Sequence, residues 1–212
     1  VDGKKTDQLK TMKRQNWLSW DFLARFPIFL LIFLTPLFFL PWGVYPVSFN
    51  KQFLVIILVL ISFFSYLGKA LKEGKLVYRR GNKILIGLLT VLVISLIFSD
   101  SFYPALFGFN GGDADSFINL ISYLLIFFLI SSQFSSLDFK TLGFVYFSSL
   151  SLLVIFQFCQ LFGVYLLPFD FTQRPDFNPI ATIFDLGVFW GANLVLILSL
   201  LFSLDLGKLI RL

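Results

Sequence analysis

Residues 53–61 read FLVIILVLI, nine apolar residues in succession. A strand of a membrane β-barrel alternates apolar and polar residues over about ten positions, so an unbroken apolar run favours an α-helix. A helix needs roughly 20 mostly apolar residues to cross the ~30 Å hydrocarbon layer of a bilayer. Because the apolar character continues to residue 70, the sequence predicts a membrane-crossing helix over about 53–70.

The rest of the chain has the same character. Of its 212 residues, 58% are apolar, only 14% are charged, and 30 are Phe. Soluble domains are typically about half apolar and about a quarter charged. This composition excludes a soluble globular enzyme, a disordered chain and a disulfide-stabilised scaffold, and it indicates an integral membrane protein.

The sequence contains no His and a single Cys, Cys159. The lack of His excludes from this chain a histidine general base, a histidine-containing catalytic triad and a His-ligated metal. One Cys can form neither an intrachain disulfide nor a Cys-rich metal cluster. The familiar catalytic arrangements are therefore not expected here.

Six apolar stretches predict an all-α fold, a polytopic transmembrane helical bundle. A basic segment, 1–21, precedes this transmembrane domain, 22–203, and a short end, 204–212, follows it. The predicted spans cover about 22–40, 53–70, 84–98, 117–132, 142–167 and 183–203.

The basic residues predict the orientation of these spans. If the N-terminus is cytoplasmic, 15 of the 17 Lys and Arg residues lie in cytoplasmic segments, and only Lys51 and Arg174 lie outside. Cytoplasmic loops of membrane proteins carry an excess of Lys and Arg, so this orientation is preferred over its inverse. Both termini are then expected in the cytoplasm.

The predicted outer loop at 99–116 holds an Asp-x-Asp pattern, Asp113 and Asp115. Two carboxylates at this spacing can hold Mg²⁺ or Mn²⁺ against a substrate pyrophosphate. The alternative is a solvated turn in which Asp115 and Ser116 cap the fourth helix. The pattern is short and common, so both interpretations stay open, and we expect no other metal site.

The predicted outer loop at 168–185 contains Arg174, which is out of place under the positive-inside tendency. A guanidinium grips phosphate in a forked geometry, which suits a lipid-linked pyrophosphate at the membrane surface. The alternative is an ion pair with Asp170 or Asp176. Asp185, near the outer end of the sixth span, is a further candidate if it is buried, although at this depth it can also reach water.

Three polar residues within the spans, Gln157, Gln160 and Asn193, have a simpler explanation. Amide side chains in transmembrane helices commonly form hydrogen bonds between helices. We expect these three to do the same.

The chain resembles the N-terminal half of the O-antigen ligase and polymerase-like membrane proteins. The likeness covers most of residues 20–212 and is spread over several short motifs. In family members an Arg, a Gly-Thr-Phe-like stretch and an Asn-Pro often precede a helix of this kind; here Ala181-Thr182 replaces or shifts the Gly-Thr part. The motifs are Leu34-Thr35-Pro36-Leu37, Tyr78-Arg79-Arg80-Gly81, Pro104–Gly108, and Arg174 with Asn178-Pro179 before Leu186–Phe189.

The resemblance implies a function in the bacterial inner membrane. Such proteins have about twelve spans and transfer glycans from a polyprenyl-pyrophosphate carrier to a glycan, lipid or protein acceptor, without metal or nucleotide cofactor. Their catalysis is ascribed to His and Arg residues of the later half. The resemblance therefore implies an N-terminal portion that is inactive alone, with the bilayer, the glycan donor and the acceptor as partners, no nucleic acid, and Arg174 as a diphosphate contact.

Two other functions fit the same composition. A small transporter or flippase component would need a polar pathway through the bilayer, and the predicted spans carry few charges for one. A non-catalytic membrane scaffold is compatible with every feature above.

Overall fold

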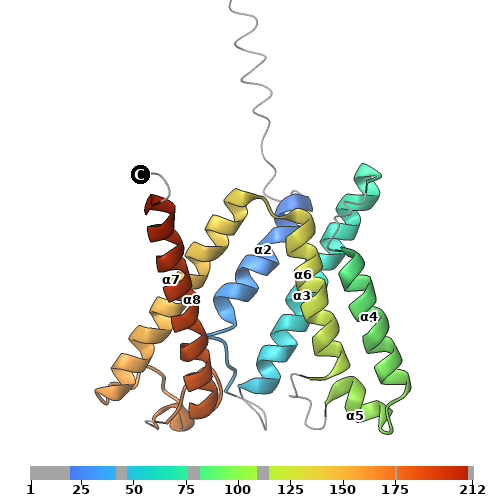
Figure 1. Cartoon of the computed structure of the whole chain (residues 1–212). Coiled ribbons are helices and arrows are strands. Elements are labelled where there is room, and N and C mark those ends of the chain that lie inside the picture. The colour runs from blue at the N-terminus through green and yellow to red at the C-terminus, as the bar shows by residue number, and fades with distance from the viewer. Residues whose placement is uncertain (1–19, 42–46, 76–81, 109–114, 175, 210–212) are drawn as a thin grey trace, which may run out of the picture. The chain divides into compact units, whose positions relative to one another are not determined.

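A computed structural model describes residues 20–41, 47–75, 82–108, 115–174 and 176–209, without the side chains of Ser48, Asn82 and 203–209. Within these residues every regular element is helical, which confirms the predicted all-α class. The elements are α2 (Trp20–Leu34), α3 (Ser48–Glu73), α4 (Asn82–Ile97), α5 (Phe102–Phe107), α6 (Phe117–Gln133), α7 (Ser136–Leu161), the 3₁₀ turn η1 (Asp170–Thr172) and α8 (Ile183–Leu209) (Figure 1).

Three helices are long and apolar enough to cross a membrane: the segments Phe49–Glu73, Ser136–Leu161 and Ile183–Phe202. Two shorter apolar helices are α4, with 16 residues, and α6, with 17 residues. At 1.5 Å per residue they rise only about 24 and about 26 Å. The membrane character predicted from the composition therefore rests on three long apolar helices and two shorter ones.

A helix occupies each of the six predicted stretches, but several of the bounds differ from the prediction; α3, for example, covers Ser48–Glu73 rather than 53–70. The first helix ends at Leu34 rather than near residue 40, because Pro36 has no N–H and restricts the residue before it. The fifth covers 136–161 rather than 142–167. It ends where Gly163 adopts a φ of +75°, a conformation that closes helix C-termini, so the apolar residues 164–167 lie outside the helix.

The predicted outer loop at 99–116 contains a short helix that the sequence pattern did not reveal. α5 begins after Ser101 and ends at Gly108, whose φ of +84° is accessible to glycine at little cost. Other predictions lie outside the described residues. These are Asp113, the turn at 110–112, the basic residues of 1–19, and parts of the cytoplasmic loops.

The chain divides into two compact units. Unit 1 comprises residues 1–32 and 52–145, and unit 2 comprises residues 33–51 and 146–212. Each unit is described below by itself.

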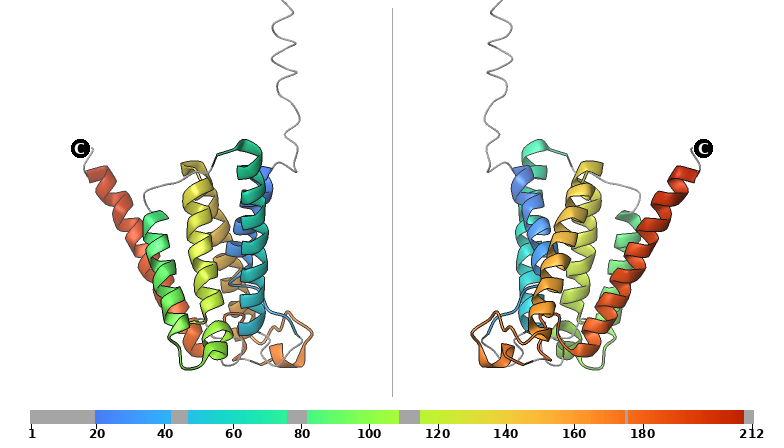
Figure 2. Two further views of the ribbon diagram at one scale, coloured as in Figure 1. Left: turned by 90° about the vertical axis from the view of Figure 1, so that its right-hand side faces the viewer. Right: turned by 90° about the vertical axis from the view of Figure 1, so that its left-hand side faces the viewer.

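Unit 1 has an apolar core formed by α2, α3 and α6. Ile28 and Leu129 are fully buried, and Val59 is nearly so. The Ser62 hydroxyl donates a hydrogen bond to the carbonyl of Ala24, which ties α3 to α2 within that core. α4 and α6 run side by side, and α5 packs on both (Figures 1 and 2).

Unit 2 is organised by α7 and α8 and by the segment that connects them. Two hydrogen bonds join the helices, from Trp190 to Gln157 at 3.1 Å and from Tyr146 to Asn193 at 2.5 Å. The expected interhelical hydrogen bonds of Gln157 and Asn193 are therefore confirmed. Gln160 differs, because its amide donates to the carbonyl of Thr172 in the connecting segment.

Candidate functional site

The segment between α7 and α8 is held by a cluster of five Phe rings. Phe177 lies at its centre, with ring centroids 5.3 Å from Phe39, 5.5 Å from Phe171 and 6.3 Å from Phe156. Phe169 stacks on Phe171 at 5.8 Å. Aromatic pairs at such distances contribute about 0.5–1.5 kcal/mol beyond their burial. The cluster gives the segment a fixed framework on which polar side chains can be positioned.

Asn178 shapes the second half of this segment. Its Oδ1 accepts hydrogen bonds from the backbone N–H groups of Ile180 and Ala181, each at 3.1 Å. This is the turn that Asn favours before a helix, and it places Thr182 at the start of α8. Asn178 is only 3% exposed, and its side-chain Nδ2 has no hydrogen-bond partner.

A cavity of about 490 Å³ lies beside this turn. Its volume falls within the ~300–1,000 Å³ range of small-molecule sites. Its walls are mainly apolar, with amide, carboxylate and indole groups among them. The lining residues are Val154, Gln157, Phe158, Gln160 and Leu161 of α7, Asp176, Phe177 and Asn178 of the connecting segment, and Ile183, Leu186 and Trp190 of α8.

Two cations meet the segment that borders the cavity. The Lys51 ammonium donates a hydrogen bond to the carbonyl of Ile180 at 3.1 Å. Arg174 Nε lies 3.5 Å from a carboxylate oxygen of Asp176, a cavity residue. Among the described residues, no carboxylate lies within 4.0 Å of the Lys51 ammonium. These are the two basic residues that the orientation argument placed outside, and the fold brings both to one segment.

Arg174 is highly exposed, with 69% of its side-chain surface accessible. The loop ion pair considered from the sequence is confirmed with Asp176 as the partner. An exposed ion pair contributes only about 0–1 kcal/mol to stability. The guanidinium can therefore turn toward an incoming anion at little cost.

Asp185 has a local structural role. Its carboxylate accepts hydrogen bonds from the Thr182 backbone N–H at 3.1 Å and from the Thr182 hydroxyl at 2.6 Å. The Thr182 oxygen in turn accepts from the Asp185 N–H at 3.2 Å. This is a capping box at the first turn of α8. The described ion pairs do not include one between Asp185 and Arg174.

Asp115 is an exposed turn residue of unit 1. Ser116 takes the N-cap position of α6, as the solvated-turn interpretation expects, but its side chain makes no capping hydrogen bond. In the part of the chain that the structure describes, no three His, Cys, Asp or Glu side chains gather as metal ligands. Because Asp113 lies outside that part, the Asp-x-Asp pattern remains a prediction.

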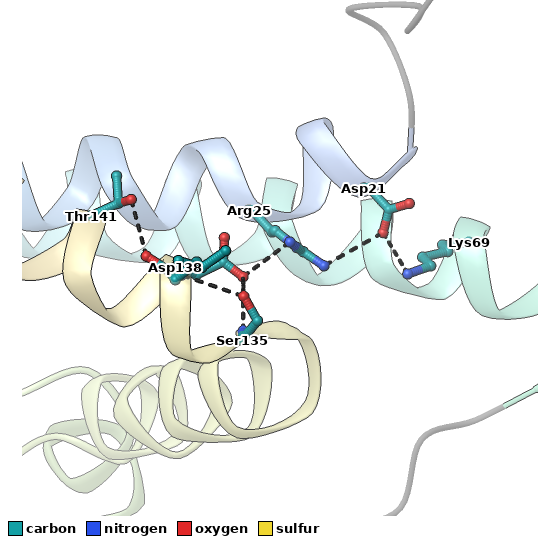
Figure 3. Close-up of polar contacts among 7 residues, drawn as sticks. Asp21, Arg25, Lys69, Ser135, Asp138 and Thr141 are labelled. Atoms are coloured by element: carbon teal, nitrogen blue, oxygen red, sulfur yellow. Dashed lines mark hydrogen bonds and ion pairs between the residues drawn. The ribbon is translucent and has the colours of Figure 1, made fainter. Parts of the chain in front are cut away.

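A second polar cluster lies in unit 1 and joins α2, α3 and α7 (Figure 3). Asp21 contacts Lys69 at 2.5 Å and Arg25 at 4.0 Å, and Arg25 contacts Asp138 at 3.1 Å. Asp138 also accepts hydrogen bonds from the backbone N–H and hydroxyl of Ser135, both at 2.8 Å. The charges alternate along this chain and cancel, which indicates a structural tie rather than a ligand site.

Sequence reasoning missed several of the residues gathered at the unit 2 cavity. Lys51 was identified as a misplaced cation, but its partner segment lies 129 positions along the chain. Asn178 was noted only as part of the Asn-Pro motif and Gln157 only as an interhelical contact. The usable signal was the coincidence of two outer cations with an Asn-Pro turn.

No protein-family model, no curated protein and no solved structure matches this chain.

Proposed function

We propose that this chain is a bacterial inner-membrane protein with six spans and cytoplasmic termini that binds a polyprenyl-pyrophosphate-linked glycan on the extracytoplasmic face. It would form the N-terminal portion of a glycan transferase of the O-antigen ligase type. The resemblance described above motivates the substrate class, and the three long apolar helices support the membrane location. The cavity of unit 2 is the proposed binding region.

The observation that carries the proposal is the convergence of Lys51 and Arg174 on one segment. A pyrophosphate offers several anionic oxygens, which match an ammonium point charge and a forked guanidinium. Lys51 contacts a neutral carbonyl and Arg174 makes an exposed ion pair, so both cations can exchange these contacts for hydrogen bonds to the ligand.

The cavity beside these cations suits an amphiphilic ligand. Phe158, Leu161 and Leu186 supply apolar parts of the wall. Asp176, also in the wall, is the carboxylate that pairs with Arg174. A lipid-linked glycan has both apolar and oxygen-rich parts, and this wall offers apolar and polar groups to both. The transfer step itself is not assigned to any residue of this chain.

The binding test uses the protein in lipid nanodiscs with Trp190 as the reporter. Trp190 lines the cavity, and the other three Trp residues are replaced by Phe (Trp17→Phe, Trp20→Phe, Trp42→Phe). Farnesyl pyrophosphate, farnesyl phosphate and farnesol are titrated in turn. We expect the affinity to decrease in that order, because each ligand has fewer anionic oxygens than the one before.

Lys51→Gln and Arg174→Gln should each weaken farnesyl pyrophosphate binding by about tenfold, since a hydrogen bond to a charged group contributes about 1.5–3 kcal/mol. Lys140→Gln is the matched control, an exposed Lys in unit 1. Binding that is insensitive to both substitutions, or equal affinity for farnesol, would contradict the proposal.

The orientation is tested separately by cysteine labelling in a Cys159→Ser background. A Cys introduced at position 174 should react with a membrane-impermeant maleimide in intact bacteria whose outer membrane is permeabilised. A Cys at position 140 should react only after the inner membrane is opened. The reverse pattern would overturn the proposed orientation.

A further inference from the structure

The unit 2 cavity contains two amide side chains whose oxygen atoms are already engaged. Asn178 Oδ1 accepts from two backbone N–H groups, and Gln157 Oε1 accepts from the Trp190 indole N–H. Backbone N–H and indole N–H are donors only, so neither amide can be turned over without losing these bonds. The network therefore fixes which end of each amide remains available.

The available ends are the Asn178 Nδ2 and the Gln157 Nε2, and both are buried without a hydrogen-bond partner. Both residues line the same cavity. A buried donor that lacks an acceptor is destabilising, and native proteins satisfy nearly all such groups. Two such donors on residues that line one cavity indicate a ligand that brings acceptor oxygens.

The charged group of the wall, Asp176, narrows the class of ligand that fits. Asp176 presents a carboxylate, which accepts hydrogen bonds and repels anions. When Arg174 turns to the pyrophosphate, the Asp176 carboxylate is left unpaired in the wall. It would then repel a phosphate in the cavity, although phosphate oxygens would satisfy the amides. Sugar hydroxyls are both donors and acceptors, so they match the amides and the carboxylate together. The apolar face of a sugar ring can also lie against Trp190 or Phe177.

We propose that this cavity is a sugar subsite in which Asn178 and Gln157 donate hydrogen bonds to the first sugar of the lipid-linked glycan. The inference deepens the proposed function and rests on it for the identity of the carrier. The cations Lys51 and Arg174 select the pyrophosphate, whereas the two amides select the sugar attached to it.

The test compares farnesyl pyrophosphate with the same carrier bearing one N-acetylhexosamine, using the Trp190 reporter in nanodiscs. We expect the sugar to increase affinity by about tenfold in the unsubstituted chain. Asn178→Asp and Gln157→Glu keep the engaged oxygen and remove the free N–H donors. Each should reduce the preference for the sugar about three- to tenfold, as expected for the loss of hydrogen bonds.

Both substitutions add a negative charge, so Gln173→Glu is the matched control on the same segment, at an exposed position that does not line the cavity. It should alter the affinity for both ligands equally and leave the preference intact. A preference that persists in both cavity variants would overturn the inference, as would its absence in the unsubstituted chain.

A second arm distinguishes failure of the carrier from failure of the sugar subsite. Octyl glucoside and octylphosphocholine share a chain length, and only the first carries a sugar. Below their micellar concentrations, only octyl glucoside should change Trp190 emission, and Asn178→Asp should suppress that change. If octyl glucoside responds while farnesyl pyrophosphate does not bind, the subsite stands and the proposed function fails. If neither octyl glucoside nor the carrier bearing the N-acetylhexosamine changes Trp190 emission, the subsite is refuted.

Discussion

The starts of α7 and α8 use the same four-residue device in two different settings. At both, an Asp three positions after a hydroxyl residue accepts hydrogen bonds from that residue's backbone N–H and hydroxyl. Asp138 in unit 1 also meets Arg25 at 3.1 Å and is 19% exposed. Asp185 in unit 2 is exposed and has no basic partner among the described residues. The same local motif thus begins α7, where its Asp also pairs with Arg25 of another helix, and α8, where its Asp bonds only within the motif.

The largest expected effect comes from breaking the fixed helix start. Asp138→Ala removes the cap of α7 and leaves Arg25 with only its longer contact to Asp21. We expect the free energy of unfolding to fall by about 2–3 kcal/mol, from loss of a cap and of a partly buried charge pair. Reversible unfolding in mixed micelles, followed by circular dichroism, measures the change.

Asp138→Asn is the control for that experiment. Its amide oxygen can still accept from Ser135, but the charge is lost, so the decrease in stability should be smaller than for Ala. If Asp138→Ala proves no more costly than the same substitution at Asp185, the comparison between the two helix starts is wrong.

A smaller effect is expected at the self-capped start. Asp185→Ala removes only the capping box of α8, which should lower stability by about 0.5–1 kcal/mol. Faster amide exchange in the first turn of α8, measured by mass spectrometry, would locate the change. Farnesyl pyrophosphate affinity should be unaltered, and a large loss of affinity would restore Asp185 as a binding residue.

The smallest effect on stability is expected at Arg174. Arg174→Gln breaks an exposed ion pair with Asp176, so the free energy of unfolding should change by less than about 0.5 kcal/mol. The same substitution should weaken pyrophosphate binding, as proposed above. A variant that loses stability and binding together would make Arg174 a structural residue instead.

The helices were predictable because their cause is local. Unbroken apolar runs such as 53–61 identify them, and Pro36 and Gly163 account for two of the helix ends that were misplaced. α5 was missed because six residues carry too little periodicity to be seen in the sequence.

The sites were only partly predictable because they depend on contacts distant in sequence. Arg174 was identified from its position against the charge bias, and Asp185 was named without the capping role that the structure gives it. Arg25 and Asp138 are 113 positions apart, and nothing in either local sequence indicates the pair. The unpaired amides of Asn178 and Gln157 became visible only when the fold showed which of their atoms are engaged.

The short lengths of α4 and α6 have a consequence for the lipids around them. In the six-span arrangement proposed above, a rise of about 24–26 Å must match a hydrocarbon layer of about 30 Å. Such hydrophobic mismatch is relieved when the bilayer thins locally or when flanking polar groups reach inward, at a cost of fractions of a kcal/mol per Å. The α4–α6 side of unit 1 would therefore be best accommodated in a thin bilayer, and lipids with short acyl chains should collect along it.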